Sequence, residues 1–251
     1  MADRFRLTYL KSTGLERSDF DESFSSRDAE KMISPASPPP EYNVPGACTS
    51  EAILKQAKAD LKHPDPRVRL CAIKYYLEKS FPAIPMSLLQ EILSDEDPEI
   101  RAQALRSLIK FRNPIVSSLL KKHLRDSDAK VRIAALRGIF QHQEKIELNI
   151  LLQLLSDQSS WVRRKVATLI GWTQIEGSLP ILMELSRDQD PMVRRAALFS
   201  LAILYPDESE NRFMEAMTDS DPVLRKCAKV ILEKIADSPL RGKTVSFVHR
   251  G

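Results

Sequence analysis

The segment RDSDAKVRIAALRGI, residues 125–139, decides the fold because the chain uses closely related segments several times. SDEDPEIRAQALRSL stands at 94–108 and RDQDPMVRRAALFSL at 187–201. Alignment on an arginine that follows Val, Ile or Leu gives six positions: Arg69, Arg101, Arg132, Arg163, Arg194 and Arg225. These arginines are 32, 31, 31, 31 and 31 residues apart. Such a fixed period predicts an array of stacked structural repeats.

Each repeat carries a strong helix-start signal a few residues before its arginine. Four repeats have an aspartate N-cap followed by proline at the first helical position: Asp65-Pro66, Asp97-Pro98, Asp190-Pro191 and Asp221-Pro222. In the other two repeats the predicted caps are Asp128 and Ser159. Apolar residues then recur at helical spacing, as at Val131, Ala135 and Ile139. We call the helix that starts here the second helix of the repeat.

An apolar run before each cap predicts a first helix. The runs are 53–61, 87–93, 115–124, 148–155, 179–185 and 211–217. The sequence therefore predicts twelve helices in six pairs with short turns. A single pair cannot bury its apolar face alone, so neighbouring pairs are expected to stack into an all-α solenoid.

Composition bounds the function. The 251 residues are 43% hydrophobic and 29% charged, as in an ordinary soluble protein, and only 7 are glycine. Few glycines argue against an all-β fold and against a glycine-rich phosphate loop. Cys48, Cys71 and Cys227 lie far apart without metal-ligand spacing. With no signal-peptide pattern and no run of 18 apolar residues, the sequence predicts a cytoplasmic protein without membrane contact.

The two ends differ from the repeats. Residues 1–48 are predicted to be a disordered tail, which ends in the proline-rich linker SPASPPPEYNVPGA at 34–47. Within it RFRLTYL, residues 4–10, is either plain disordered sequence or a short docking segment. The repeats are assigned to 49–236. In the C-terminal tail, 237–251, TVSFVH at 244–249 is predicted to cap the last repeat, to extend a partner's sheet, or to be disordered.

Two segments carry a family resemblance. DSDAKVRIAAL at 126–136 and DQDPMVRRAAL at 188–198 share the run D-x-x-x-x-V-R-x-A-A. The pattern resembles HEAT repeats, of the short type found in phycobilisome lyases. The resemblance covers residues 50–236 and implies an armadillo-like helical solenoid. It says little about function, because this module serves many kinds of partner.

A ladder of opposite charges follows the repeat. In the first repeat His63 stands six residues before the repeat arginine. In the other five repeats this position is an aspartate: Asp95, Asp126, Asp157, Asp188 and Asp219. The resemblance implies a structural ladder, in which the arginine and the turn aspartate of adjacent repeats interlock. We therefore exclude the repeat arginines from the candidate site.

Two further columns on the second helix suggest where a partner binds. One residue after the ladder arginine stand Leu70, Ala102, Ile133, Arg164, Arg195 and Lys226, and five residues after it stand Lys74, Arg106, Arg137, Thr168, Phe199 and Val230. The columns are four residues apart, so they share one face of the helix. The resemblance implies that this face is concave. The predicted partner-binding residues are Lys74, Arg106, Arg137, Arg164, Thr168, Trp172, Arg195, Phe199 and Lys226.

The alternative for these columns is a solvated face with Trp172 and Phe199 used in packing. The same face continues into Lys110, Gln141, Trp172 and Ile203. Trp161, beside the Ser159 cap, is predicted either to pack across the turn or to lie exposed on the rim.

No catalytic pattern is present. The four histidines occur in no HExxH or His-Glu arrangement, and Trp172 is followed by Glu176 where a HEAT-like DNA glycosylase would need an aspartate. The sequence predicts a scaffold or adaptor that is not an enzyme, has no cofactor or metal, and binds an acidic protein. Two alternatives stay open: tetrapyrrole handling like that of phycobilin lyases, and nucleic-acid binding through the basic columns.

Overall fold

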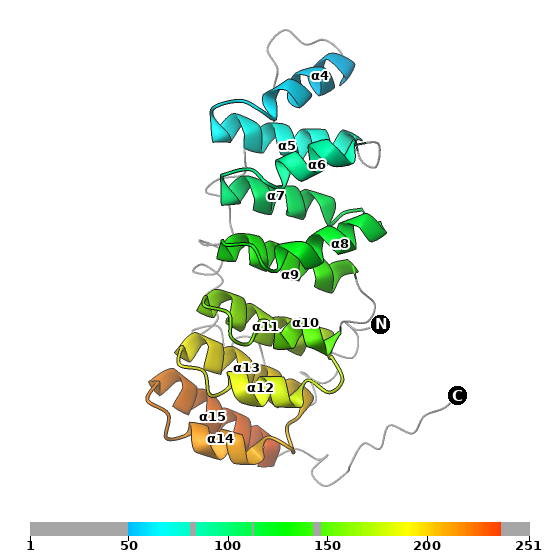
Figure 1. The fold of residues 1–251 in the computed structure, drawn as a ribbon. Helices are drawn as coiled ribbons and strands as arrows, with labels where there is room; N and C mark the ends of the chain where they lie inside the picture. The colour runs from blue at the N-terminus through cyan, green and yellow to red at the C-terminus, as the bar shows by residue number, and fades with distance from the viewer. Residues whose placement is uncertain (1–49, 81–83, 112, 143–146, 237–251) are drawn as a thin grey trace, which may run out of the picture. The chain divides into compact units, whose positions relative to one another are not determined.

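A computed structural model describes residues 50–80, 84–111, 113–142 and 147–236 (Figure 1). These ranges hold twelve α-helices and no strand. Two compact units divide the chain between Glu147 and Leu148. We call their described parts the N-terminal unit, 50–147, and the C-terminal unit, 148–236. The predicted all-α class with six helix pairs is confirmed.

The helices alternate between first and second helices of a pair. The N-terminal unit contains α4 (Ser50–Asp60), α5 (Pro66–Ser80), α6 (Met86–Ile92), α7 (Pro98–Leu108), α8 (Pro114–His123) and α9 (Ala129–His142). The C-terminal unit contains α10 (Leu148–Leu152), α11 (Ser160–Thr173), α12 (Leu179–Leu185), α13 (Pro191–Leu204), α14 (Glu210–Ala216) and α15 (Pro222–Ala236). Every second helix begins directly after its predicted cap.

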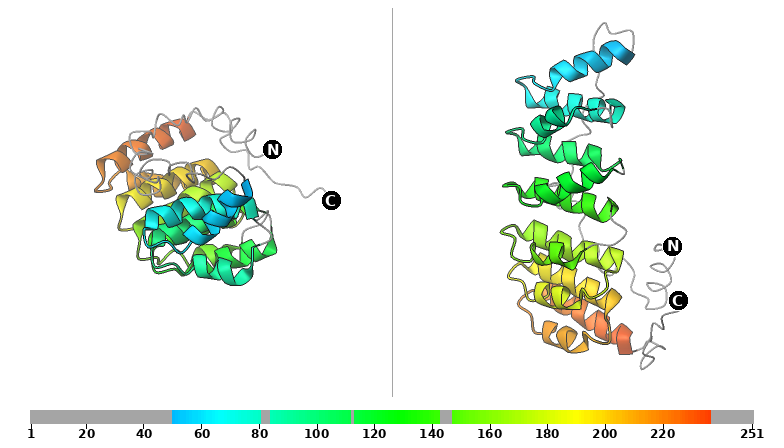
Figure 2. Two further views of the ribbon diagram at one scale, coloured as in Figure 1. Left: turned by 90° about the horizontal axis from the view of Figure 1, so that it is seen from above. Right: turned by 45° about the vertical axis from the view of Figure 1, so that its right-hand side comes forward.

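Second helices form the continuous layer of each unit. In the N-terminal unit α7 packs on both α5 and α9, and in the C-terminal unit α13 packs on both α11 and α15. Figure 2 shows the three second helices of each unit lying side by side. First helices form the other layer, where α4, α8, α12 and α14 each pack mainly on their own second helix.

The small residue three positions after the ladder arginine explains how closely the second helices pack. Its exposed fraction is 0% in all six repeats, where it is Ala72, Ala104, Ala135, Val166, Ala197 or Ala228. Larger apolar side chains of the second helices, such as Leu105 and Leu136, are also fully buried. The repeat consensus is therefore a packing consensus.

Five predicted aspartate caps make the expected hydrogen bond. Each carboxylate accepts the backbone N–H two residues later at 2.7–3.1 Å. The Ser159 cap is different, because its side chain accepts no cap hydrogen bond. Its backbone has the same extended conformation as Asp190, and its N–H donates to the Asp157 carboxylate at 2.9 Å. The turn aspartate thus fixes this helix start without help from the serine hydroxyl.

Several predictions concern residues outside the described ranges. They include the tail and linker at 1–48, the RFRLTYL segment, Cys48 and the TVSFVH segment, so the domain boundaries at 49 and 236 stay predictions. Within the ranges that are described, every helix is too short or too polar to span a membrane.

Candidate functional site

The predicted ladder is present in both units. Each of four arginines binds the aspartate of the next repeat through two hydrogen bonds of 2.6–3.0 Å. The pairs are Arg69–Asp95, Arg101–Asp126, Arg163–Asp188 and Arg194–Asp219. A planar guanidinium suits this two-bond geometry.

Each ladder arginine also holds the turn of its own repeat. Arg163 donates from Nη1 to the carbonyl oxygens of Asp157 at 2.7 Å and Gln158 at 3.4 Å. Its partner Asp188 accepts the N–H of Asp190 at 2.8 Å. Burial acts to raise the pKa of Asp188, but the hydrogen bonds from Arg163 and Asp190 outweigh it and leave that pKa below its usual value. The ladder arginines are occupied in holding adjacent repeats together.

The basic columns of the N-terminal unit place three cations on adjacent second helices. Lys74 on α5 is exposed and Arg137 on α9 is half-buried, and neither forms an ion pair with any residue that the structure describes. Arg106 on α7 donates to Gln103 Oε1 at 3.1 Å and forms an ion pair with Glu99.

A cavity of about 300 Å³ lies between α7 and α9. It brings the predicted residues Arg106 and Arg137 together with Lys110 and Gln141 from the same face, and it adds Lys130 as a fourth cation. The buried side chains of Ile133 and Ala134, with Ile109, supply its apolar lining. The site is therefore a basic rim around an apolar floor.

Two carboxylates of the protein face these cations. Glu99 forms the ion pair with Arg106 and lies 3.7 Å from Lys130 Nζ, and Glu78 of α5 forms an ion pair with Lys110. Arg137 keeps its charge unpaired among the described residues. Four cations against two carboxylates leave the cavity with an excess of positive charge.

The C-terminal unit uses two of its three predicted cations internally. Arg164 is 8% exposed, and its guanidinium carbon lies 5.6 Å from the centre of the Trp161 ring. Trp161 is half-buried and lies beside a residue of its own helix, so its predicted packing across the turn stays a prediction. Arg195 binds both carboxylate oxygens of Asp221. Burial acts to raise the pKa of Asp221, and the bond from Arg195 overcomes it and lowers that pKa.

The remaining predicted residues of this unit differ in exposure. Lys226 is exposed and makes no ion pair within the described ranges. Trp172 is 41% exposed, with Lys165 Nζ 5.5 Å from its ring centre. Phe199 is half-buried, and the Thr168 hydroxyl donates to the Arg164 carbonyl in its own helix at 2.9 Å. Lys226 and Trp172 are thus the most accessible of the predicted set in this unit.

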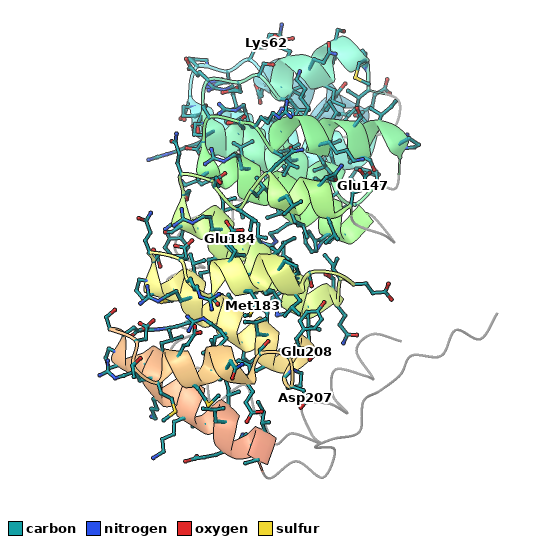
Figure 3. All side chains as sticks on the ribbon, turned by 60° about the horizontal axis from the view of Figure 1, so that its bottom comes forward. Lys62, Glu147, Met183, Glu184, Asp207 and Glu208 are labelled. Carbon is teal, nitrogen blue, oxygen red and sulfur yellow. The ribbon has the colours of Figure 1, made fainter. Side chains whose placement is uncertain are left out.

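Exposed acids of the C-terminal unit lie on or beside its first helices. Figure 3 labels Glu184 on α12 and Asp207 and Glu208 in the turn before α14, and all three are exposed. The second-helix columns of this unit carry Arg164, Arg195 and Lys226 instead.

The described ranges offer no cluster of three or more His, Cys, Asp or Glu that could hold a metal ion. His123 is buried, and its two ring nitrogens face the carbonyl oxygens of Leu119 at 2.7 Å and Leu93 at 3.3 Å. This histidine therefore joins α8 to the end of the preceding first helix.

Sequence reasoning missed Glu99 and Lys130 as parts of the site. They are 31 residues apart and occupy the same position in adjacent repeats. Because stacked second helices bring equivalent positions side by side, opposite charges at one period are a usable signal for such a pair.

A family model described as HEAT repeats matches residues 50–140 and 116–202. No curated protein sequence matches the chain. Among solved structures, YibA of Escherichia coli is 20% identical, with 78% of this chain and 82% of that chain covered and a TM-score of 0.52. That likeness shows the fold alone.

Two further solved structures are similar to a smaller degree. The complex of CpcE and CpcF of phycocyanin lyase from Nostoc is 20% identical over 82% of this chain and 87% of that chain, with a TM-score of 0.47. A designed armadillo repeat protein in complex with a (KR)4 peptide is 18% identical over 72% of this chain and 98% of that chain, with a TM-score of 0.45.

Proposed function

Because the chain belongs to the HEAT-repeat family, we propose that it is a non-catalytic scaffold that binds an acidic segment of another protein. Stacked repeats hold their surface residues in fixed positions and offer extended binding surfaces. The second-helix face is the proposed contact surface in each unit. The compartment is proposed to be the cytoplasm, which agrees with the free thiols of Cys71 and Cys227.

The observation that carries this proposal is a set of accessible cations on the second helices. Lys74, Arg137 and Lys226 occupy the predicted columns and have no acidic partner among the residues described. Long side chains whose charge is unpaired attract an acidic partner over about a Debye length, roughly 8 Å at physiological salt. The exposed Trp172 offers an apolar anchor of the type that dominates binding energy at protein interfaces.

The same geometry favours a protein over a nucleic acid. Arg106 and Arg195 are already bound by carboxylates, and Arg164 is buried against Trp161. A phosphate backbone gains its affinity from many simultaneous contacts with free cations, each adding about 0.9 to the salt slope for duplex DNA. Isolated cations beside apolar surface support binding to a protein segment instead.

Affinity capture from nuclease-treated native lysate tests the proposal. The baits are the wild type, the variant Lys74→Glu/Arg137→Glu, the variant Lys226→Glu, and the control Lys122→Glu on the first helix α8. We expect a discrete protein that the wild type and the control retain and that at least one second-helix variant loses. Capture that is equal for all four baits, or capture that is seen only when the nuclease treatment is omitted in a parallel sample, would overturn the proposal.

A further inference from the structure

We infer that the cavity between α7 and α9 binds an acidic peptide segment carrying one apolar side chain, and that Glu99 takes the place of the ligand carboxylate while the cavity is empty. This inference rests on the proposed function, which it narrows to one site and one ligand chemistry. It is carried by the way the four cations of the cavity are paired.

The shape of the cavity fits a side chain better than a cofactor. Its volume of about 300 Å³ is at the lower end of the roughly 300–1,000 Å³ typical of small-molecule pockets. The floor of Ile109, Ile133 and Ala134 offers no charge, so it favours an apolar group. An aliphatic or aromatic side chain that covers this floor is removed from water, which favours binding in proportion to the apolar area that is buried.

The rim selects the groups that flank this side chain. Arg106 and Lys130 come from neighbouring second helices, and the single carboxylate of Glu99 faces both of them. Glu99 itself is half-buried in the first turn of α7, two residues after the Asp97 cap, so the helix start fixes its position. A carboxylate of the peptide can replace Glu99 as the partner of Arg106 and Lys130, so that both cations stay paired when the peptide is bound.

Arg137 gives the ligand a binding group without any exchange. It lines the same cavity and has no ion pair with a described residue. A guanidinium forms two parallel hydrogen bonds with a carboxylate, which neutral hydrogen bonds do not match in strength. Lys74 is exposed on α5, the second helix that also packs on α7, and offers a further cation for another acidic residue of the same segment.

The full-length protein can be titrated into three fluorescein-labelled twelve-residue peptides and followed by anisotropy. The first alternates Asp and Glu with Ser and Gly around a central Leu, the second has Ser in place of Leu, and the third has Asn and Gln in place of the acids. We expect the first peptide to bind at least about tenfold more tightly than the others, a difference of about 1.4 kcal/mol.

Protein variants then test the role of each charge. Arg137→Glu and the milder Arg137→Gln are expected to weaken binding of the first peptide by about tenfold or more, the loss of one charge-assisted hydrogen-bonded pair. Glu99→Gln is expected to tighten it about threefold or more, because the internal competitor is neutral. The control Lys122→Glu on the first helix α8 makes the same charge change as Arg137→Glu, yet is expected to shift binding less than twofold.

Several outcomes would overturn the inference. They are weaker binding by Glu99→Gln, equal binding by Arg137→Gln and the control, or equal binding of the peptides with and without leucine. Its failure is separable from that of the proposed function. If a captured protein depends on Lys226 but no peptide binds the cavity, the scaffold proposal stands and the cavity is not its site.

Discussion

At the scale of the residue, the ladder arginine is held both by the aspartate of the adjacent repeat and by backbone carbonyl oxygens of its own turn. In the Arg163–Asp188 pair the two side chains are 7% and 9% exposed, and every guanidinium nitrogen has an acceptor. Removing water from two charges costs free energy, which their bidentate bonding and the added backbone hydrogen bonds offset. The main consequence is that, within each unit, these pairs fix adjacent repeats in one register.

Truncation of one partner should therefore be costly. We expect Asp188→Ala to lower the free energy of unfolding by about 3–5 kcal/mol, because Arg163 then keeps a buried charge without a partner. Urea denaturation followed by circular dichroism measures this change. As a matched control, Lys229→Ala removes the exposed Lys229–Glu233 pair, 3.9 Å long with side chains 68% and 61% exposed, and should cost less than about 0.5 kcal/mol. Similar losses in both variants would contradict a stabilising ladder.

The ladder also predicts a response to acid. Burial acts to raise the pKa values of Asp126, Asp188 and Asp219, but their arginine partners overcome it and lower them. A carboxyl with a lowered folded-state pKa contributes stability above its unfolded pKa of about 3.9, and this stability is lost as the pH falls through the folded value. We expect the urea midpoint to decrease steeply below about pH 4. The decrease should be shallower in Asp188→Asn, and equal slopes would contradict the assignment.

At the scale of the element, the sequence predicts the second helices almost completely. The Asp-Pro caps and the 31-residue period place their starts, since both signals are local and strong. First helices are less certain: the run at 148–155 predicts eight residues, but α10 ends at Leu152. Ser159 does stand at the N-cap of α11, but the side-chain hydrogen bond expected of such a cap is not formed. Local patterns report the conformation of the backbone, whereas the partner of each polar side chain is fixed by packing.

One close contact between helices should limit substitution. A Cβ added at Gly171 of α11 would overlap Ser200 Oγ of α13 and lie 2.9 Å from its Cβ and 3.3 Å from its Cα. The hydroxyl of Ser200 donates to the Ala167 carbonyl across the same contact at 2.8 Å. Gly171→Ala is expected to cost about 1–3 kcal/mol, although alanine favours a helix by about 1 kcal/mol over glycine.

Gly138→Ala in α9 provides the comparison. Its added Cβ would lie 2.5 and 2.9 Å from the two methyl carbons of Leu120 and 2.9 Å from Ile109 Cγ1, and these nearest neighbours include no backbone atom. Thermal unfolding of both variants should show a clearly larger loss for Gly171→Ala. A larger loss at Gly138 would show that the α11–α13 contact adapts more readily than its geometry indicates.

At the scale of the whole molecule, the sequence repeat predicts which helix face carries the candidate site. It does not predict which cations of that face are left without an acidic partner. Subtracting the consensus locates the two columns, and the structure places Arg106 and Arg137 at one cavity. The sequence gives Arg164, Arg195 and Lys226 the same weight, whereas Trp161 and Asp221 remove the first two from the surface charge. These contacts depend on the conformations of long side chains, which the spacing of the repeats does not predict.

Because Arg164 is buried and Lys226 is exposed, we expect substitution of Arg164 to affect stability and substitution of Lys226 to affect partner binding. Arg164→Ala should lower the unfolding free energy, since it removes a buried side chain that packs on Trp161, and any effect on a partner should follow from that loss. Lys226→Ala should leave the urea midpoint unchanged and weaken partner binding. Denaturation and binding measured on both variants check this, and the reverse pattern would show that Arg164 is the contact residue.

The central claim is that second-helix cations bind an acidic protein segment, and isothermal titration of the purified captured partner tests it most directly. We predict that Lys74→Glu/Arg137→Glu raises the Kd at least about tenfold at physiological salt, which equals 1.4 kcal/mol, while Lys122→Glu changes it less than twofold. Equal Kd values for the wild type and both variants would contradict the account.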